Sequence, residues 1–324
     1  NVEFAAHSQW SKVNLSQLAI PGTHLSGQVT NKAAEGFILD FSGADADIQS
    51  LYDKPDAPDS PAAAAPPAAK PQTPLDIRFA IGSVTTAPDR RLQGARGRIV
   101  RNTRGWSYLD INGTVGNATP ISVQLVPNGG GRRMDIHTED AGAMLSTLRL
   151  MENIRGGKLT VTGQSSGPGP VPALVDMRNF SYLEASTLRR LAQQAQPEGA
   201  EALAKEKGRS FSRLKADIRY NEDGIEVKNA RMAGDLLGLT LGGRVDLEQG
   251  QIDLSGTLVP LYGINSLVSG IPVIGWLLTG GEGGGIFAAT YRVKGPLANP
   301  ETSVNPLAML APGFLRELFF VDKH

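Results

Sequence analysis

The sequence predicts a mainly β protein, an elongated and curved antiparallel sheet that forms a repeated β-groove with short helices between its repeat units. Glycine and proline are frequent, with 38 and 21 residues among 324, which favours strands and turns over a helical bundle. Many short segments alternate apolar and polar residues, as half-buried strands do. Long amphipathic helices are few, so a sheet must provide most of the fold.

Composition limits the possible functions. Lysine plus arginine equals aspartate plus glutamate at 32 each, so no net charge attracts nucleic acid, and we expect no nucleic-acid partner. The absence of cysteine excludes disulfides and thiolate metal sites. The sequence begins at Asn1 without a signal-like segment. We therefore expect a piece of a longer or processed chain whose N-terminal anchor is missing here.

The N-terminal part, residues 1–52, is interpreted as the end of a preceding β-groove repeat. Alternation predicts strands at 12–18, 24–30 and 36–41, and a short helix with Ile48, Leu51 and Tyr52 at helical spacing follows. Residues 53–74 contain seven prolines and seven alanines, a composition that cannot form a packed core. This segment is therefore predicted to be an extended linker or loop.

Residues 75–209 are predicted to contain β-groove repeat units with short helices. Ile77, Phe79 and Ile81 alternate with polar or small residues, and further strands follow between glycine and asparagine turns. This meander ends in a predicted helix with Met144, Leu148 and Met151 along one face. Three segments share a strand, a polar turn and a short apolar-striped helix, which suggests a repeated unit, although this arrangement is also common without repetition.

Residues 210–304 show the strongest alternation and are assigned to a C-terminal β domain with an apolar capping segment. Four predicted strands place aliphatic residues on one face and charged residues on the other. No charge occurs in the 28 residues between Asp253 and Glu282, but prolines and glycines interrupt this run. It could cap a groove or contact a membrane interface, form buried core, or span a membrane. Residues 305–324 are predicted to form a C-terminal interfacial helix.

Three segments resemble catalytic, metal-binding or phosphate-binding motifs but lack features that these sites require. Gly163 to Gly167 matches the G-x-S-x-G nucleophile elbow, but the prolines that follow cannot start the required helix. Asp135, His137 and Glu139 lie at period two on one strand face, a pattern that is more often a solvated surface than a metal site. The glycine cluster at 280–285 lacks the spacing of a phosphate-binding loop. We expect no enzyme activity, no catalytic residue, no metal and no cofactor.

The aliphatic strand faces have no obvious covering element in the sequence. Either a second sheet covers them, or a non-protein apolar ligand does. An acyl chain of about 16 carbons gains roughly 13 kcal/mol gross from apolar walls, at about 0.8 kcal/mol per methylene. The residues predicted to line such a lipid groove are Ile77, Phe79, Ile81, Leu214, Ile218, Tyr220, Ile225, Val227, Leu237, Leu239, Leu241, Ile252, Leu254 and Leu258.

Four motifs near the C-terminus carry a family resemblance when taken together and in order. They are GQIDLSG at 250–256, IPVIGWLLTG at 271–280, ATYRVKGPLANP at 289–300 and VNPLAMLAPGFLRELF at 304–319. About 110 residues that include them resemble the C-terminal region of the AsmA-like family, in particular its large YhdP-like members. The proline- and alanine-rich insertion fits no pattern of this family.

This resemblance implies a periplasmic protein, anchored in the inner membrane through a missing N-terminal segment and reaching toward the outer membrane. Similar proteins are bridge-like lipid-transfer proteins, in which phospholipids pass along an apolar groove between the two membranes. The C-terminal end is then expected to contact a membrane through Pro272, Trp276, Leu277, Phe314, Leu315, Phe319 and Phe320. The terminal helix could instead dock on the sheet.

Two other functions remain open at this stage. The chain could be a structural or assembly factor of the outer membrane, with a protein-closed core and no lipid. It could also be a parallel β-helix enzyme that acts on a polysaccharide, but hairpin-like spacing disfavours this reading.

Overall fold

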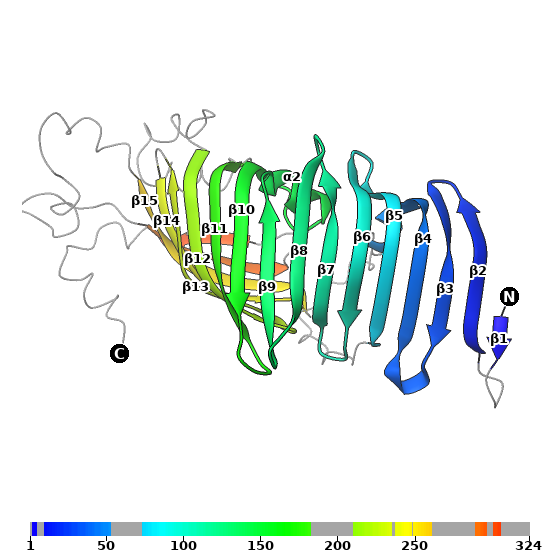
Figure 1. Ribbon diagram of the computed structural model, residues 1–324. Helices are drawn as coiled ribbons and strands as arrows, with labels where there is room; N and C mark the ends of the chain where they lie inside the picture. The colour runs from blue at the N-terminus through cyan, green and yellow to red at the C-terminus, as the bar shows by residue number, and fades with distance from the viewer. Residues whose placement is uncertain are drawn as a thin grey trace, which may run out of the picture.

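The computed structural model describes residues 2–4, 10–52, 73–182, 210–234, 237–247, 249–260, 289–296 and 301–305. Within them, 17 strands form one long, curved and unclosed sheet, as predicted (Figure 1). Each strand pairs with the next one along the chain, and all pairs except one are antiparallel. Figure 1 shows β2 to β9 side by side, with the later strands turning behind them.

The strands of the first half are β1 (Val2–Phe4), β2 (Trp10–Ile20), β3 (Thr23–Asn31), β4 (Phe37–Asp47), β5 (Leu75–Ala87), β6 (Arg90–Arg101), β7 (Trp106–Val115), β8 (Thr119–Asn128) and β9 (Gly131–Thr138). Those of the second half are β10 (Ile154–Gln164), β11 (Val171–Tyr182), β12 (Ser210–Asn221), β13 (Gly224–Gly234), β14 (Leu237–Asp246), β15 (Gln251–Pro260), β16 (Ala289–Pro296) and β17 (Glu301–Asn305). The described helices are η1 (Ala33–Glu35), α1 (Gln49–Tyr52) and α2 (Ala141–Thr147).

The exception to antiparallel pairing is the pair β4 and β5. These strands run parallel, with Leu39 opposite Ile77 and Phe41 opposite Phe79. Parallel neighbours need a long crossover connection, and residues 48–74 supply it. A slip of one residue would turn every side chain of β5 to the other face, so the register keeps the apolar faces of the two strands together.

The helices are shorter than the sequence predicts. Helix α1 has four residues, and its Leu51 is 79% exposed, so Leu51 does not pack in the core. Helix α2 begins at Ala141, where the Asp140 side chain accepts a hydrogen bond from the Ala143 backbone N–H. It ends at Thr147, before Arg149 adopts a positive φ of 58°. The helix predicted after residue 182 lies outside the described residues.

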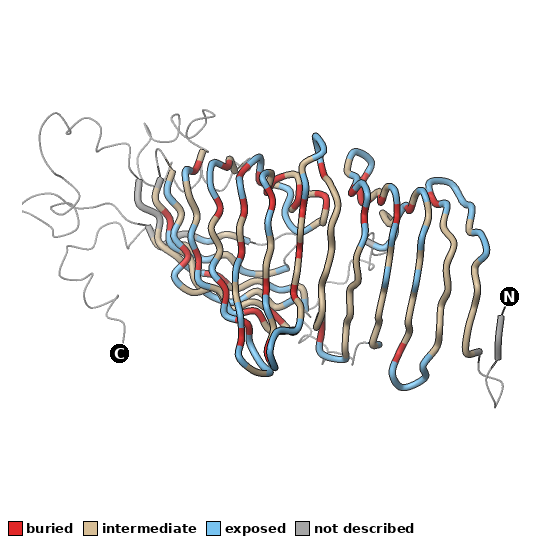
Figure 2. The backbone as a smooth tube through the Cα atoms, in the orientation of Figure 1, coloured by how far each residue is buried: buried red, intermediate tan, exposed pale blue. Residues whose placement is uncertain are grey.

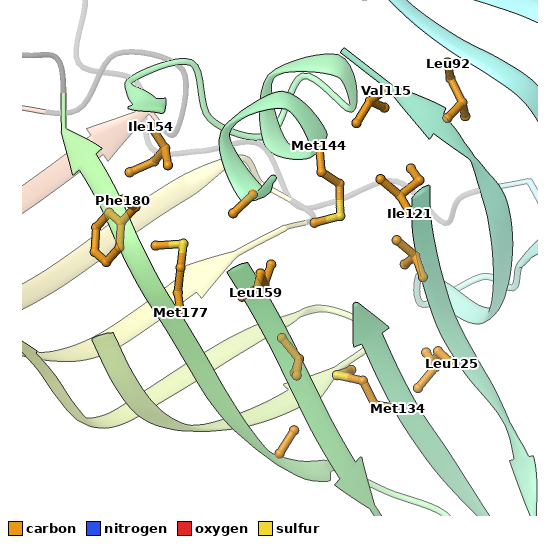
Figure 3. Packing of buried hydrophobic residues seen from close by; sticks show 14 of the residues in the cluster. Leu92, Val115, Ile121, Leu125, Met134, Met144, Ile154, Leu159, Met177 and Phe180 are labelled. Carbon is orange, nitrogen blue, oxygen red and sulfur yellow. The ribbon is translucent and has the colours of Figure 1, made fainter. Parts of the chain in front are cut away.

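The hydrophobic core lies on one face of the sheet, where α2 packs against β10, β6, β7 and β11. Met144 points from α2 into the cluster and is 2% exposed (Figure 3). Its buried neighbours come mainly from β7 to β12, and Figure 2 shows many buried positions on β8 to β12 but few on β2 to β4. Met151, predicted on the same helix face as Met144, lies beyond the helix and is 48% exposed, so that prediction is wrong.

The alternation predicted between residues 211 and 258 is confirmed as β12 to β15. The charge-free run between Asp253 and Glu282 begins within β15 and lies outside the described residues after Pro260. The helix predicted at 305–324 also lies outside them, except for Asn305, which ends β17. Strands β16 and β17 continue the sheet.

Candidate functional site

An unbroken apolar row crosses the sheet from β2 to β16. Every position in it is an aliphatic residue, a methionine or a glycine, and each is paired with the next across a strand boundary. In order, the row is Val13, Val29, Leu39, Ile77, Ile99, Leu109, Leu125, Met134, Gly163, Ala173, Ile218, Val227, Gly243, Leu254 and Val293. Paired residues share a face, so this row defines one apolar face, called here the inner face.

The adjacent row lies on the opposite face, called here the outer face, and is polar. From β2 to β13 it consists of Asn14, Gln28, Asp40, Arg78, Arg98, Asp110, Gln124, Asp135, Thr162, Leu174, Asp217 and Lys228. Leu174 is the one apolar member of this row and is 61% exposed. The two faces therefore differ sharply in chemistry along most of the sheet.

Bidentate ion pairs tie neighbouring strands together on the outer face. Arg213 of β12 binds both oxygens of Asp176 of β11 at 3.0 and 2.6 Å, and Arg178 binds the same carboxylate. These hydrogen bonds from Arg178 and Arg213 hold the pKa of Asp176 well below its usual range. Arg292 of β16 binds Asp253 of β15 in the same bidentate way. The outer face is thus internally neutralised.

The inner face has a filled section and an open one. Between β7 and β12 its row members Leu125 and Met134 are buried at 1% and 6% exposure and pack in the core cluster. On β2 to β6 the members of the apolar row, and Phe41 beside them, are half-buried and neither belong to that cluster nor pack against it in the described part of the chain. These six, called here the open patch, are Val13, Val29, Leu39, Phe41, Ile77 and Ile99.

The filled section is closed at one end by a contact between two distant hairpins. The Tyr220 hydroxyl of β12 donates a hydrogen bond of 2.7 Å to the Trp106 carbonyl of β7. Beside it, Glu222 lies between Arg104 and Arg132, with N–O distances of 3.2 and 3.1 Å. Gly105 has φ of 147°, and a Cβ there would overlap the Glu222 carbonyl oxygen, so glycine permits this close approach. We call this group of residues the rim contact.

The structure places the predicted groove residues at inner-face positions of the register, but not all on an accessible surface. Ile81, Tyr220, Leu239 and Leu254 are buried at 8% exposure or less, so their side chains present little accessible surface. Four others, Phe79, Leu214, Ile218 and Ile225, pack against the core. Ile77, Val227, Leu241 and Ile252 are half-buried and outside that cluster. Leu237 pairs with Pro260 and Leu258 pairs with Leu239, near the same end of the pairing of β14 with β15.

The predicted membrane-contact residues lie outside the described residues. They are Pro272, Trp276, Leu277, Phe314, Leu315, Phe319 and Phe320. Among the described helices, none is long and apolar enough to cross a bilayer.

Sequence reasoning missed most of the open patch. Val13, Val29 and Leu39 were within predicted strands, but they were not selected because no pattern joined these strands to Ile77 across the insertion. The usable signal was the apolar residue at every second position of the segment 37–41, which coincides with the apolar positions 75, 77 and 79. It identifies a shared face once the two strands are paired in parallel.

The rejected motifs have structural roles. Ser165, the serine of the G-x-S-x-G match, accepts a hydrogen bond from the Arg132 backbone N–H and donates one to the Gly167 carbonyl. Glu139 binds Lys158 at 2.6 Å and lies 3.3 Å from His137. No group of three or more metal-ligating side chains occurs among the residues that the structure describes.

The fold and the two faces define a class of protein: a single open, curved β-sheet with one apolar and one polar face. Comparison with known proteins goes no further, since no family model, no curated protein and no solved structure matches the chain.

Proposed function

We propose that this chain is a non-enzymatic lipid-transfer segment that binds phospholipid acyl chains on the inner face of its sheet. The observation that carries the proposal is the open patch. It is part of the continuous apolar row, yet the described core does not cover it. An apolar sheet face normally packs against protein, so an uncovered one favours an apolar ligand.

Acyl chains suit this surface energetically. The row contains no side chain that needs a hydrogen bond, so a hydrocarbon can lie on it without leaving a polar group unpaired. Each buried methylene contributes about 0.8 kcal/mol, and the total is reduced by the entropy lost on binding. The five strands from β2 to β6 span about 19 Å at a spacing of about 4.8 Å, a length on the scale of an extended acyl chain.

The proposed setting follows the resemblance to YhdP-like members of the AsmA-like family. In this proposal the chain lies in the periplasm, between the inner and outer membranes, and its partners are phospholipids and those membranes. The mainly β, curved sheet is compatible with such a conduit.

A second candidate function is a structural or assembly role in the outer membrane without lipid cargo. It is favoured by the filled section of the inner face, where Leu125, Met134 and Met144 leave no room for a ligand. Under our first proposal, acyl chains therefore lie on the open patch and not between β7 and β12. The two functions differ in whether the open patch carries lipid.

The experiment is native mass spectrometry with lipid extraction of the chain purified from a bacterial envelope. The wild type is expected to carry phospholipid, and Ile77→Glu to lose most of it, because a carboxylate on the open patch cannot be buried under an acyl chain. Ile77 is half-buried, so a well-folded variant is feasible.

The matched control is Leu174→Glu. Leu174 is also aliphatic but lies on the outer face at 61% exposure, so this variant should keep the lipid. A folded, lipid-free wild type would favour the structural role. Equal amounts of bound lipid in the wild type and in folded Ile77→Glu would contradict the proposal that the open patch binds lipid.

A further inference from the structure

The open patch ends, toward the β6–β7 turn, in a row with different chemistry. Two residues beyond Ile77 and Ile99 along the paired strands, Leu75 lies opposite Arg101, and both are on the inner face. Arg101 in turn lies opposite Trp106 of β7. An apolar surface therefore borders directly on a guanidinium and an indole ring.

Among the residues that the structure describes, Arg101 has no carboxylate partner, in contrast to Arg213, Arg178 and Arg292 of the outer face. Its guanidinium carbon lies 5.6 Å from the centre of the Trp106 ring, and Nη2 donates a hydrogen bond of 3.1 Å to the Thr73 carbonyl. Nε is buried and has no hydrogen-bond partner within the described part of the chain. By contrast, Arg98 on the same strand but on the outer face binds both oxygens of Asp76 at 2.8 and 2.9 Å.

The nearby rim contact does not neutralise Arg101. Its carboxylate, Glu222, is engaged by Arg104 and Arg132, each within 3.2 Å. At this margin Arg101 lies over the Trp106 ring, the charges of Arg132, Glu222 and Asp223 act on Tyr220, and Arg244 pairs with Asp223, so four arginines face two carboxylates. The local charge is positive, although the whole chain carries none.

We propose that Arg101 binds the phosphate of a glycerophospholipid whose acyl chains lie on the open patch. This inference rests on the proposed lipid-binding function and adds a head-group site to it. Arginine suits phosphate because its planar fork presents several donors to the phosphate oxygens. Tryptophan suits the same boundary, since it combines an apolar ring with one polar N–H. The site selects lipids with a phosphate over uncharged lipids with the same chains.

The experiment compares two water-soluble probes with identical short acyl chains, dioctanoyl phosphatidylglycerol and dioctanoylglycerol, by calorimetric titration of the full chain. The wild type is expected to bind the phosphate-bearing lipid at least about tenfold more tightly, as a charge-assisted hydrogen bond allows. Arg101→Gln should remove this preference and leave dioctanoylglycerol binding unchanged, while Arg101→Lys should retain part of it. Inorganic phosphate alone should not displace the bound lipid.

The matched control is Arg96→Gln, which removes an exposed arginine from the outer face of the same strand and should preserve the preference. Equal affinity of the wild type for both probes, or an unchanged preference in Arg101→Gln, would overturn the head-group site while lipid binding stands. Displacement by inorganic phosphate would likewise overturn it by identifying a simple anion site. Absence of binding by either probe would overturn the lipid-binding function itself.

Discussion

The Tyr220 hydroxyl and the Trp106 carbonyl, 114 residues apart in sequence, are joined by a hydrogen bond of 2.7 Å. The bond connects β12 to β7, so it closes five strand pairings into one unit that α2 fills. Loss of the hydroxyl in Tyr220→Phe leaves a carbonyl without its partner, and we expect a loss of about 1 to 2 kcal/mol in unfolding free energy. Urea unfolding measures this, with Tyr108→Phe as a control of the same chemistry on the outer face. Equal stability of both variants would contradict a stabilising role of the bond.

The same residue predicts an alkaline dependence of stability. Burial raises the pKa of Tyr220 to about 12, whereas a tyrosine in the unfolded chain titrates near pH 10. The folded state therefore retains a proton that the unfolded state loses, and stability decreases as pH rises from about 10 to about 12. Urea unfolding across this range should show a smaller decrease for Tyr220→Phe than for the wild type. Parallel curves for the two proteins would refute this assignment.

Glu222 should be the more important carboxylate of the β12–β13 turn. Glu222→Gln places Arg104 and Arg132 near each other without a compensating charge, and we expect it to cost about 1 to 3 kcal/mol. The neighbouring Asp223 forms an exposed pair with Arg244 at 2.9 Å, so Asp223→Asn should cost less than about 1 kcal/mol. Thermal or urea unfolding distinguishes the two variants. A larger effect of Asp223→Asn would mean that the rim contact does not stabilise the filled section.

Two methionines test how α2 contributes to the core. Met144→Ala should destabilise the protein by about 2 to 4 kcal/mol, because Met144 is 2% exposed and its truncation leaves a cavity. Met151→Ala should change stability by less than about 0.5 kcal/mol, since that side chain is 48% exposed. Comparable losses of stability in both variants would show that Met151 also packs against the core.

Alternation was a sufficient guide to the sheet itself, as the confirmed strands from Leu214 onward show. It could not provide the neighbour of each strand across an insertion, and the parallel pairing of Leu39 with Ile77 joins segments separated by the proline- and alanine-rich segment. The residue at which α2 ends could not be predicted from the sequence either. The apolar spacing from Met144 to Met151 is helical, but Arg149 takes a left-handed conformation that breaks the helix.

The sequence predicted which residues share the inner face, but not how accessible each of their side chains is. The periodicity that identifies an inner face cannot separate side chains that pack on protein from those that do not, because both are aliphatic. Leu239 and Ile77 have the same sequence signature, yet the first is 7% exposed inside the core and the second belongs to the open patch. The difference in burial depends on the curvature of the sheet, which brings β12 toward β7 and cannot be predicted from alternation.

The most direct test of the central claim is to map where an acyl chain touches the protein. A phospholipid with a photoactivatable diazirine on its acyl chain would be bound to the full chain, cross-linked by light, and the modified residues identified by mass spectrometry. We expect adducts on peptides that contain Leu39, Ile77 and Ile99, and none on the buried Leu125 or Met144. Cross-links confined to the outer face, or spread equally over both faces, would contradict the proposal that the open patch is the lipid site.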